Sequence, residues 1–357
     1  MADLDTPDAI KILDSKNLAG SIEQLGRQCQ QVWDEVSALK LNSDFSSAKN
    51  IVVVGMGGSA LGAHITHSLY SGNLKVPLEI VNGYHIPGYV DWQTLVTLFS
   101  YSGTTEEVLA AYKEAVEKGA KMVVITSGGD LGKLVESKEV GGYVFEPHFN
   151  PSGQPRMGLG YSILSQVLIL AKLNFLRFDE EDLQKILAII EKVNSQSKIE
   201  IESRENQAKQ TASKFFGKIP FLFASEHLVG NSHTFANQIN ENAKSLSGYF
   251  ALPEADHHLI EGLVSTEEIH QKVVFFFLKS NLYSPRVLAR YDITNEIVEK
   301  NGIEALVFEP ESQTRLEQVF EFLTFASWVS FYLAMLYDRD PSPIPNVDFL
   351  KSEMTKG

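Results

Sequence analysis

The sequence predicts an α/β protein built from two doubly wound, parallel-sheet halves that follow an N-terminal helical extension. Apolar runs of strand length alternate with helical stretches along most of the chain, which is the order of parallel strands joined by crossover helices. The order also repeats, because KEAVEKGAKMVVITSG and NEIVEKNGIEALVFEP each contain a helix, a glycine stop and a strand. A duplicated α/β unit explains both observations.

The extension, residues 1–50, contains one predicted amphipathic helix at 18–36. Ser21 and Gln24 predict a capping box near its start. Cys29, the only cysteine, excludes an internal disulfide and fits a reducing compartment. It lies on the apolar stripe of the helix, so we expect a buried structural thiol. That stripe recurs at three- and four-residue steps and comprises Leu18, Ile22, Leu25, Cys29, Val32 and Val36.

The first predicted half spans residues 51–180 and the second spans 181–357. In the first half we expect strands at 51–54, 77–81, 95–99 and 122–126, and helices at 60–70, 105–118 and 158–176. In the second half we expect a long polar helical stretch at 180–216, strands at 221–224, 273–277 and 305–308, and helices at 286–300 and 316–337. The apolar run 322–337 is shorter than a bilayer requires, which predicts a buried core helix.

Charge and composition narrow the class of function. The chain of 357 residues is 44% hydrophobic and 21% charged, as expected for a globular protein. Its formal net charge of −14 argues against nucleic-acid binding, since phosphate backbones would be repelled. An anionic ligand would therefore have to be held by local dipoles and hydroxyls. The acidic first residues lack the apolar stretch of a secretory signal, so we expect a cytoplasmic protein that does not bind membranes.

A glycine-rich motif, GMGGSALG at residues 55–62, lies between a predicted strand and a predicted helix. Glycines let the backbone approach a ligand, and the helix N-terminus offers free N–H groups to an anion. The motif also matches the dinucleotide pattern G-x-G-x-x-A, which requires an acidic residue where the next strand ends. That strand ends in Val81-Asn82-Gly83, which disfavours a dinucleotide-binding dehydrogenase.

A second motif, SYSGTTEE at residues 100–107, again joins a strand to a helix. Four hydroxyls surround one glycine, which is typical of an anion nest at a helix N-terminus. Simple helix capping would need only one of these hydroxyls. The motif therefore favours a phosphate site, and one that requires neither Lys nor Arg.

The two motifs in this order resemble the sugar isomerase (SIS) domain. Further along, PRMGLGYS around Arg156, NENAKS around Glu241 and EADHHLIEG around His257 resemble the bifunctional phosphoglucose/phosphomannose isomerase family. The resemblance runs from about residue 50 to the 340–351 tail. Thr104 replaces an Asn that is frequent in the family, and Asp256-His257-His258 replaces the more usual Asn-His-Asn.

The resemblance implies two SIS-type subdomains, a homodimer, no metal and no organic cofactor. It also implies interconversion of glucose 6-phosphate or mannose 6-phosphate with fructose 6-phosphate. The expected binding partner is therefore a small sugar phosphate. By the same resemblance Glu241 moves the proton between C1 and C2, Arg156 stabilises the enediolate and His257 assists ring opening. Lys351 is expected to close over the substrate. The implied phosphate-binding residues are Gly58, Ser59, Ser100, Ser102 and Thr105.

General chemistry is consistent with these roles but does not select them. Proton transfer through an enediol needs one carboxylate that reaches both carbons, and a positive charge near the oxyanion. Taken alone, Glu241 and Lys244 would read as a solvated helix pair, and His257 and His258 as loop residues. Glu261 is the next candidate for the base.

Some alternatives stay open on the sequence alone. One is a sugar-phosphate sensor that uses the same fold without catalysis, although no basic helix-turn-helix precedes the first strand. Three further points are also open: the preference for glucose or mannose, the use of another ketose phosphate or an amino sugar, and the choice between His257 and His258.

Overall fold

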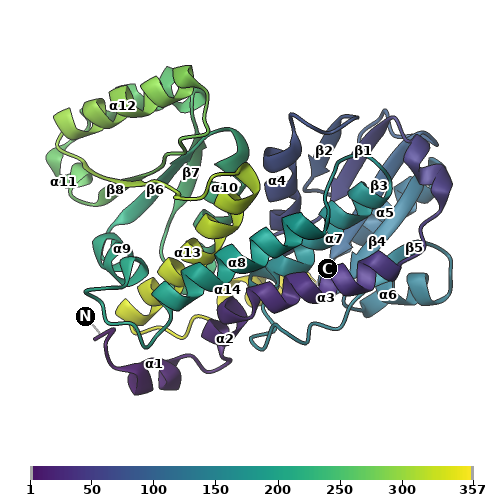
Figure 1. The fold of residues 1–357 in the computed structure, drawn as a ribbon, viewed down its shortest axis with the longest axis horizontal. Helices are drawn as coiled ribbons and strands as arrows, with labels where there is room; N and C mark the ends of the chain where they lie inside the picture. The colour runs from purple at the N-terminus through teal and green to yellow at the C-terminus, as the bar shows by residue number, and fades with distance from the viewer. Residues whose placement is uncertain (1–2, 355–357) are drawn as a thin grey trace.

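The computed structural model describes residues 3–354 and contains two parallel sheets (Figure 1). Both sheets share one strand arrangement, in which the first strand of each half lies between the second and the third. This arrangement confirms the predicted α/β fold with two doubly wound halves. The first sheet, in the order β2-β1-β3-β4-β5, consists of β1 (Asn50–Val54), β2 (Leu78–Val81), β3 (Thr94–Ser100), β4 (Lys121–Thr126) and β5 (Gly141–Val144). The second, in the order β7-β6-β8-β9, consists of β6 (Ile219–Ala224), β7 (Gly248–Ala251), β8 (Val273–Leu278) and β9 (Glu304–Phe308).

Helices precede, join and follow these strands. In the N-terminal extension and first half they are α1 (Pro7–Leu13), α2 (Leu18–Glu23), α3 (Leu25–Ala38), α4 (Gly58–Tyr70), α5 (Glu106–Glu117), α6 (Gly129–Glu136) and α7 (Leu159–Lys172). The remaining helices are α8 (Glu180–Ser197), α9 (Gln207–Phe215), α10 (Val229–Gln238), α11 (Glu267–His270), α12 (Pro285–Lys300), α13 (Arg315–Leu336) and α14 (Pro345–Met354). A π-helical turn, Ile239–Ala243, extends α10.

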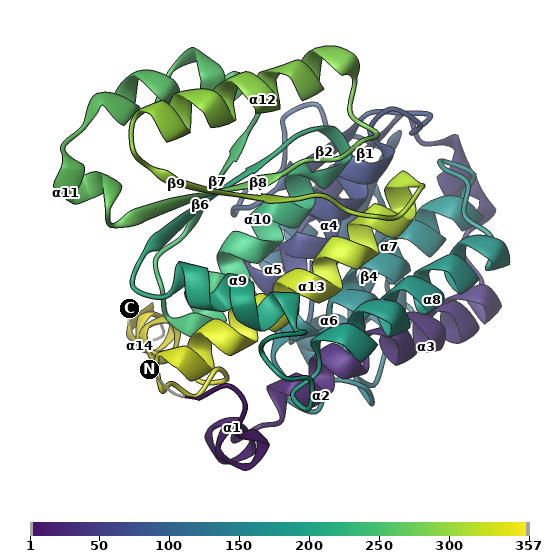
Figure 2. The ribbon, with the colours of Figure 1, turned by 60° about the vertical axis from the view of Figure 1, so that its left-hand side comes forward.

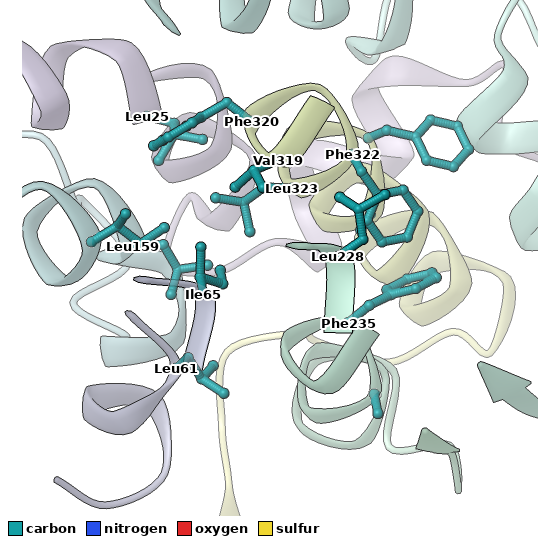
Figure 3. Close-up of a cluster of buried hydrophobic side chains, with 14 of the residues drawn as sticks. Leu25, Leu61, Ile65, Leu159, Leu228, Phe235, Val319, Phe320, Phe322 and Leu323 are labelled. Carbon is teal, nitrogen blue, oxygen red and sulfur yellow. The ribbon is translucent and has the colours of Figure 1, made fainter. Parts of the chain in front are cut away.

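The main core lies between the two sheets, where α4, α7, α10 and α13 pack together (Figures 1 and 2). Figure 3 shows Leu61 and Ile65 of α4, Leu159 of α7 and Phe235 of α10 gathered near Leu323 of α13. A smaller core fills the space between the first sheet and the helices α5 and α6 on its other face. The helices between the sheets therefore join the two halves into one packed unit.

The two central strands explain why much of the fold was predictable. β3 (TLVTLFS) and β8 (VVFFFL) are buried along their whole length. Parallel strands covered on both faces appear in sequence as continuous apolar runs. β5 (GGYV) and β7 (GYFA) were not predicted, because each is a four-residue strand at a sheet edge that begins with glycine.

The predicted helix at 18–36 is divided in the structure into α2 and α3, with Gln24 between them. The predicted capping box was wrong. Asn17 is the N-cap of α2 and its side-chain oxygen accepts a hydrogen bond from Gly20 N at 3.0 Å. The Ser21 hydroxyl instead donates to Ser152 Oγ at 2.9 Å, because tertiary packing brings a loop of the first half against the helix. Cys29 is buried, as predicted.

The polar stretch 180–216 is also divided, into α8 and α9. Asn206 begins α9, since its side-chain oxygen accepts from Lys209 N at 3.1 Å. Its amide nitrogen donates to Ser197 O at the end of α8, at 2.9 Å. The Asn206 side chain therefore caps the start of α9 and also binds the last residue of α8.

The helix α13 is a core helix, as predicted. Among residues 3–354 it is the one helix that is long and apolar enough to cross a membrane by those criteria alone. Every residue of its most apolar stretch is buried inside the protein. Trp328 in this stretch donates to Asn194 Oδ1 of α8 at 2.9 Å, so α13 is enclosed by protein on that side.

The N-terminal extension does not stand apart from the rest of the chain. α3 packs against α7 and also against α8, which lie on either side of the boundary predicted at residue 180. The domain limits 1–50, 51–180 and 181–357 therefore stay predictions.

Candidate active site

The loop after β3 gathers hydroxyls at the start of α5. Ser100 Oγ is buried, lies 2.7 Å from Thr105 Oγ1 and accepts from Gly103 N at 3.0 Å. The exposed hydroxyls of Ser102 and Thr104 are 3.1 Å apart. Thr105 is the N-cap residue of α5, yet its side chain makes no capping hydrogen bond. The first N–H groups of α5 are therefore left without a side-chain cap in the loop where the sequence predicts the phosphate.

Gly103 fixes the shape of this nest. Its φ is +71°, a conformation that favours glycine, and a Cβ there would lie 1.8 Å from Gly128 O. No other residue fits without displacing the loop after β4. The nest is thus held closely against a neighbouring loop of the same sheet.

The glycine-rich motif lies beside the nest. Ser59 is 7% exposed, and its Oγ accepts a hydrogen bond from Tyr101 N at 2.9 Å. One lone pair of this hydroxyl is therefore already used within the protein. A Cβ on Gly58 would lie 2.8 Å from Arg156 N, so glycine allows the loop bearing Arg156 to pass the start of α4. At the end of β2, Asn82 donates to Gly55 O at 2.7 Å and occupies the place where a dinucleotide site needs a carboxylate.

Arg156 is buried, and each of its five N–H donors has a protein acceptor. Its guanidinium therefore joins three separate segments of the chain and has no donor to spare. The acceptors are Asn242 Oδ1 at 2.5 Å, Gln154 Oε1 at 2.8 Å, Glu241 Oε2 at 3.2 Å, Pro341 O at 2.8 Å and Ser342 O at 3.0 Å.

Glu241 lies in the π-helical turn that extends α10, a feature that often marks functional sites. Its carboxylate pairs with Arg156, whereas Lys244 bonds to backbone carbonyls instead. Burial raises the pKa of Glu241 above its ordinary value. The charges of Arg156, Lys244 and Lys351 act in the opposite direction without cancelling the effect of burial.

Hydrogen bonds connect the nest to this carboxylate. Asn150 Nδ2 donates to Tyr101 Oη at 2.8 Å and to Gln154 O at 2.9 Å. Gln154 Oε1 in turn accepts from Arg156, which donates to Glu241. Tyr101, Asn150 and Gln154 were not predicted as site residues, because their role depends on contacts that no motif spacing reveals.

Lys351 lies on the exposed helix α14, and its positive charge lowers the pKa of Glu241. His257 is exposed in the segment after β7. Within residues 3–354 the structure gives His257 no hydrogen bond or ion pair with the other predicted site residues. His258 Nε2 lies 3.0 Å from Glu254 Oε2, and Glu261 is exposed.

Comparison with known proteins gives matches in both halves. The SIS domain family matches residues 44–134, and the bacterial phospho-glucose isomerase C-terminal SIS domain matches residues 204–354. The bifunctional phosphoglucose/phosphomannose isomerase of Caldicellulosiruptor bescii is 31% identical over 94% of this chain and 98% of its own length. The protein of the same name from Aquifex aeolicus is 32% identical over 91% of this chain and 94% of its own. A D-glucosamine-6-phosphate 4-epimerase of Sulfolobus acidocaldarius is 33% identical over 67% of this chain and 72% of its own.

Proposed function

Because this chain belongs to the bifunctional phosphoglucose/phosphomannose isomerase family, we propose that Glu241 is the base with which it isomerises its sugar phosphate. The protein is an aldose–ketose isomerase. The proposed substrates are glucose 6-phosphate and mannose 6-phosphate, each interconverted with fructose 6-phosphate. The sensor alternative has no support among these relatives, which are named as bifunctional isomerases or as an epimerase.

One observation carries the proposal: the half-buried carboxylate of Glu241 pairs with an arginine whose five donors all have acceptors, and hydrogen bonds link that arginine to the anion nest. Burial keeps the pKa of Glu241 raised, which makes its carboxylate a stronger base than an exposed one. The hydroxyls of Ser102 and Thr105 and the first N–H groups of α5 are suited to a phosphate. Ser59 and Ser100 shape the same loops through their own hydrogen bonds.

The proposed reaction moves one proton between adjacent carbons. Glu241 takes the proton from C2 of the open-chain aldose while the C1 carbonyl oxygen gains a proton, which gives an enediol. Glu241 then returns the proton to C1 as the O2 hydroxyl becomes the ketone, and the proton that O2 releases makes up for the one that O1 gained. Atoms and charge balance without any added reactant.

Arg156 supports this step through its charge. All five of its donors already have acceptors in the protein. Arg156 is therefore proposed to stabilise a developing enediolate by its positive charge and not by a hydrogen bond to the substrate. His257 is proposed to assist ring opening, for which an imidazole is suited near neutral pH. Lys351 is proposed to close over the bound sugar, and the effect of its charge on Glu241 supports that position.

The test is a coupled assay that starts from fructose 6-phosphate and measures glucose 6-phosphate and mannose 6-phosphate separately. We expect both products. Glucosamine 6-phosphate is included as a competing substrate, because one relative is named for its 4-epimerisation. Binding of fructose 6-phosphate without either product would contradict the proposed substrates, and turnover of glucosamine 6-phosphate alone would assign an amino sugar instead.

We also propose that the protein acts as a homodimer in the cytoplasm. The family resemblance supports the dimer, and the composition supports the location. Light scattering on the purified protein would give twice the mass of one chain, and a monomer that is fully active would contradict the dimer.

A further inference from the structure

Lys244 occupies a constrained position directly after the π-helical turn that bears Glu241. Its φ is +51°, which a residue other than glycine rarely adopts without support from its surroundings. The lysine backbone N–H donates to Ile239 O at the start of the turn. Residues held in this way occur preferentially at functional sites.

The Lys244 ammonium spans two segments of the chain. Nζ donates to Asn242 O at 3.2 Å, within the Glu241 turn, and to Asp340 O at 2.7 Å, beyond α13. In return, Arg339 donates to Lys244 O at 2.7 Å. Both the backbone and the side chain of Lys244 thus hold the segment 339–342 against the turn.

The same segment holds Arg156. Pro341 O and Ser342 O accept from Arg156 Nη2, while Asn242 in the turn accepts from Arg156 Nε. Arg156, the Glu241 turn, Lys244 and the segment 339–342 therefore form a closed ring of hydrogen bonds. The two remaining Arg156 donors, both on Nη1, go to Gln154 and to Glu241.

We infer that Lys244 is a positioning residue, which aligns Arg156 and Glu241 for proton transfer by fastening the segment 339–342 to the turn that bears Glu241. This inference rests on the proposed role of Glu241. Lys244 acts on the reaction through these two groups and through its charge, and it is not assigned a contact with the substrate.

Its surroundings make this role dependent on pH. Burial lowers the pKa of Lys244 to about 8, and Arg156 and Arg339 also lower it, whereas Asp340 and Glu241 raise it. Above that pH the ammonium loses a proton and its charge. Since the positive charge of Lys244 lowers the pKa of Glu241, its removal should raise that pKa further.

The experiment measures kcat and KM for fructose 6-phosphate between about pH 6 and about pH 9 in four proteins. These are the wild type, Lys244→Met, Lys244→Arg and Lys279→Met. Lys279 is a matched control, because it lies in the same half and pairs with Asp292 and Glu309 away from the site. It should behave as the wild type.

We expect Lys244→Met to lower kcat about tenfold to a hundredfold, as small misplacements of reacting groups do, with KM within about twofold. The acid limb of its kcat–pH profile should move to higher pH, because the pKa of Glu241 rises. Wild-type kcat should fall above about pH 8, and Lys244→Arg should lack that fall because arginine stays protonated.

A rise in KM as large as the fall in kcat for Lys244→Met would overturn the inference. A fall in kcat above about pH 8 in Lys244→Arg that equals the wild-type fall would also overturn it. If the methionine variant does not fold, the arginine variant alone decides between these results. Glu241→Gln is assayed beside them. An active Glu241→Gln would refute the base assignment, whereas an inactive one beside a wild-type-like Lys244→Met would refute only the role of Lys244.

Discussion

The hydroxyls of the anion nest have different surroundings, and so should differ in function. Ser100 is buried and bonded within its own loop, whereas Ser102 is exposed. Thr105 bonds to Ser100 but does not cap α5. Removing the Ser102 or Thr105 hydroxyl should therefore affect a bound anion more than the fold.

Ser102→Ala and Thr105→Ala should each weaken substrate binding by about 1.5–3 kcal/mol, the usual contribution of a hydrogen bond to a charged group. KM should rise with a smaller loss of kcat, as measured by steady-state kinetics. Thr314→Ala is the control, because Thr314 caps α13 by accepting from Glu317 N, so its loss should lower stability and leave KM unchanged. Normal binding of fructose 6-phosphate by both nest variants would place the phosphate elsewhere.

The two adjacent histidines should differ in importance. His258 pairs with Glu254, and Asp256 is fixed to α12 by Arg290 at 3.0 Å and Thr294 at 2.8 Å. His257 has no such partner within the described chain. We expect His257→Ala to slow the turnover of cyclic substrate far more than His258→Ala. The opposite ranking in the same assay would move the ring-opening role to His258.

At this scale the sequence indicated residue types better than it indicated contacts. Ser102, Thr105 and Glu241 could be selected because they lie in motifs with a family resemblance. Gln154 and Lys244 could not, since each acts through a partner more than 80 residues away in sequence. Gln154 is linked to Glu241 through Arg156, and Lys244 donates to Asp340 O. Such contacts arise only when the two halves pack together.

Among the structural elements, α5 and α12 occupy equivalent positions in the two halves but begin differently. The first N–H groups of α5 have no side-chain cap. At the start of α12, Ser284 N donates to Glu226 Oε1 at 3.0 Å, and Arg315 donates to the other carboxylate oxygen at 2.9 Å. A carboxylate of the protein itself thus occupies the second helix start, which leaves the first as the candidate for phosphate.

Glu226→Ala should therefore lower stability by about 1–2 kcal/mol, because it removes two hydrogen bonds at a partly exposed site. KM for fructose 6-phosphate should not change, since the hydroxyls proposed to bind the phosphate lie in the other half, at the start of α5. Chemical denaturation and steady-state kinetics on the same preparation would measure both. A raised KM with unchanged stability would mean that the second helix start also serves the substrate.

Elements differed in how well the sequence predicted them. The buried strands β3 and β8 were evident as apolar runs. The break between α2 and α3 at Gln24 was not, because the apolar stripe of the predicted helix continues across it, from Ile22 to Leu25. The π-helical turn at 239–243 was also missed, since nothing in its composition distinguishes it from the end of an α-helix.

On the scale of the whole molecule, the site is formed by segments from both halves and the C-terminal region. Arg156 comes from a loop of the first half, Glu241 from the end of α10 in the second, and the segment 339–342 from beyond α13. An acidic chain with a net charge of −14 thus gathers Arg156, Lys244 and Lys351 around one carboxylate. Local positive charge offsets an unfavourable overall field there.

The central claim is that Glu241 transfers the proton, and Glu241→Gln tests it most directly. The amide keeps the size of the side chain and an oxygen that can accept from Arg156, but it lacks the basic carboxylate. We expect isomerisation to slow by about 10²–10⁴-fold, the usual cost of losing a positioned general base. KM should change little, and exchange of the C2 proton of glucose 6-phosphate with deuterated solvent should disappear. Near-wild-type isomerisation with continued exchange would contradict the claim and make Glu261 the next candidate.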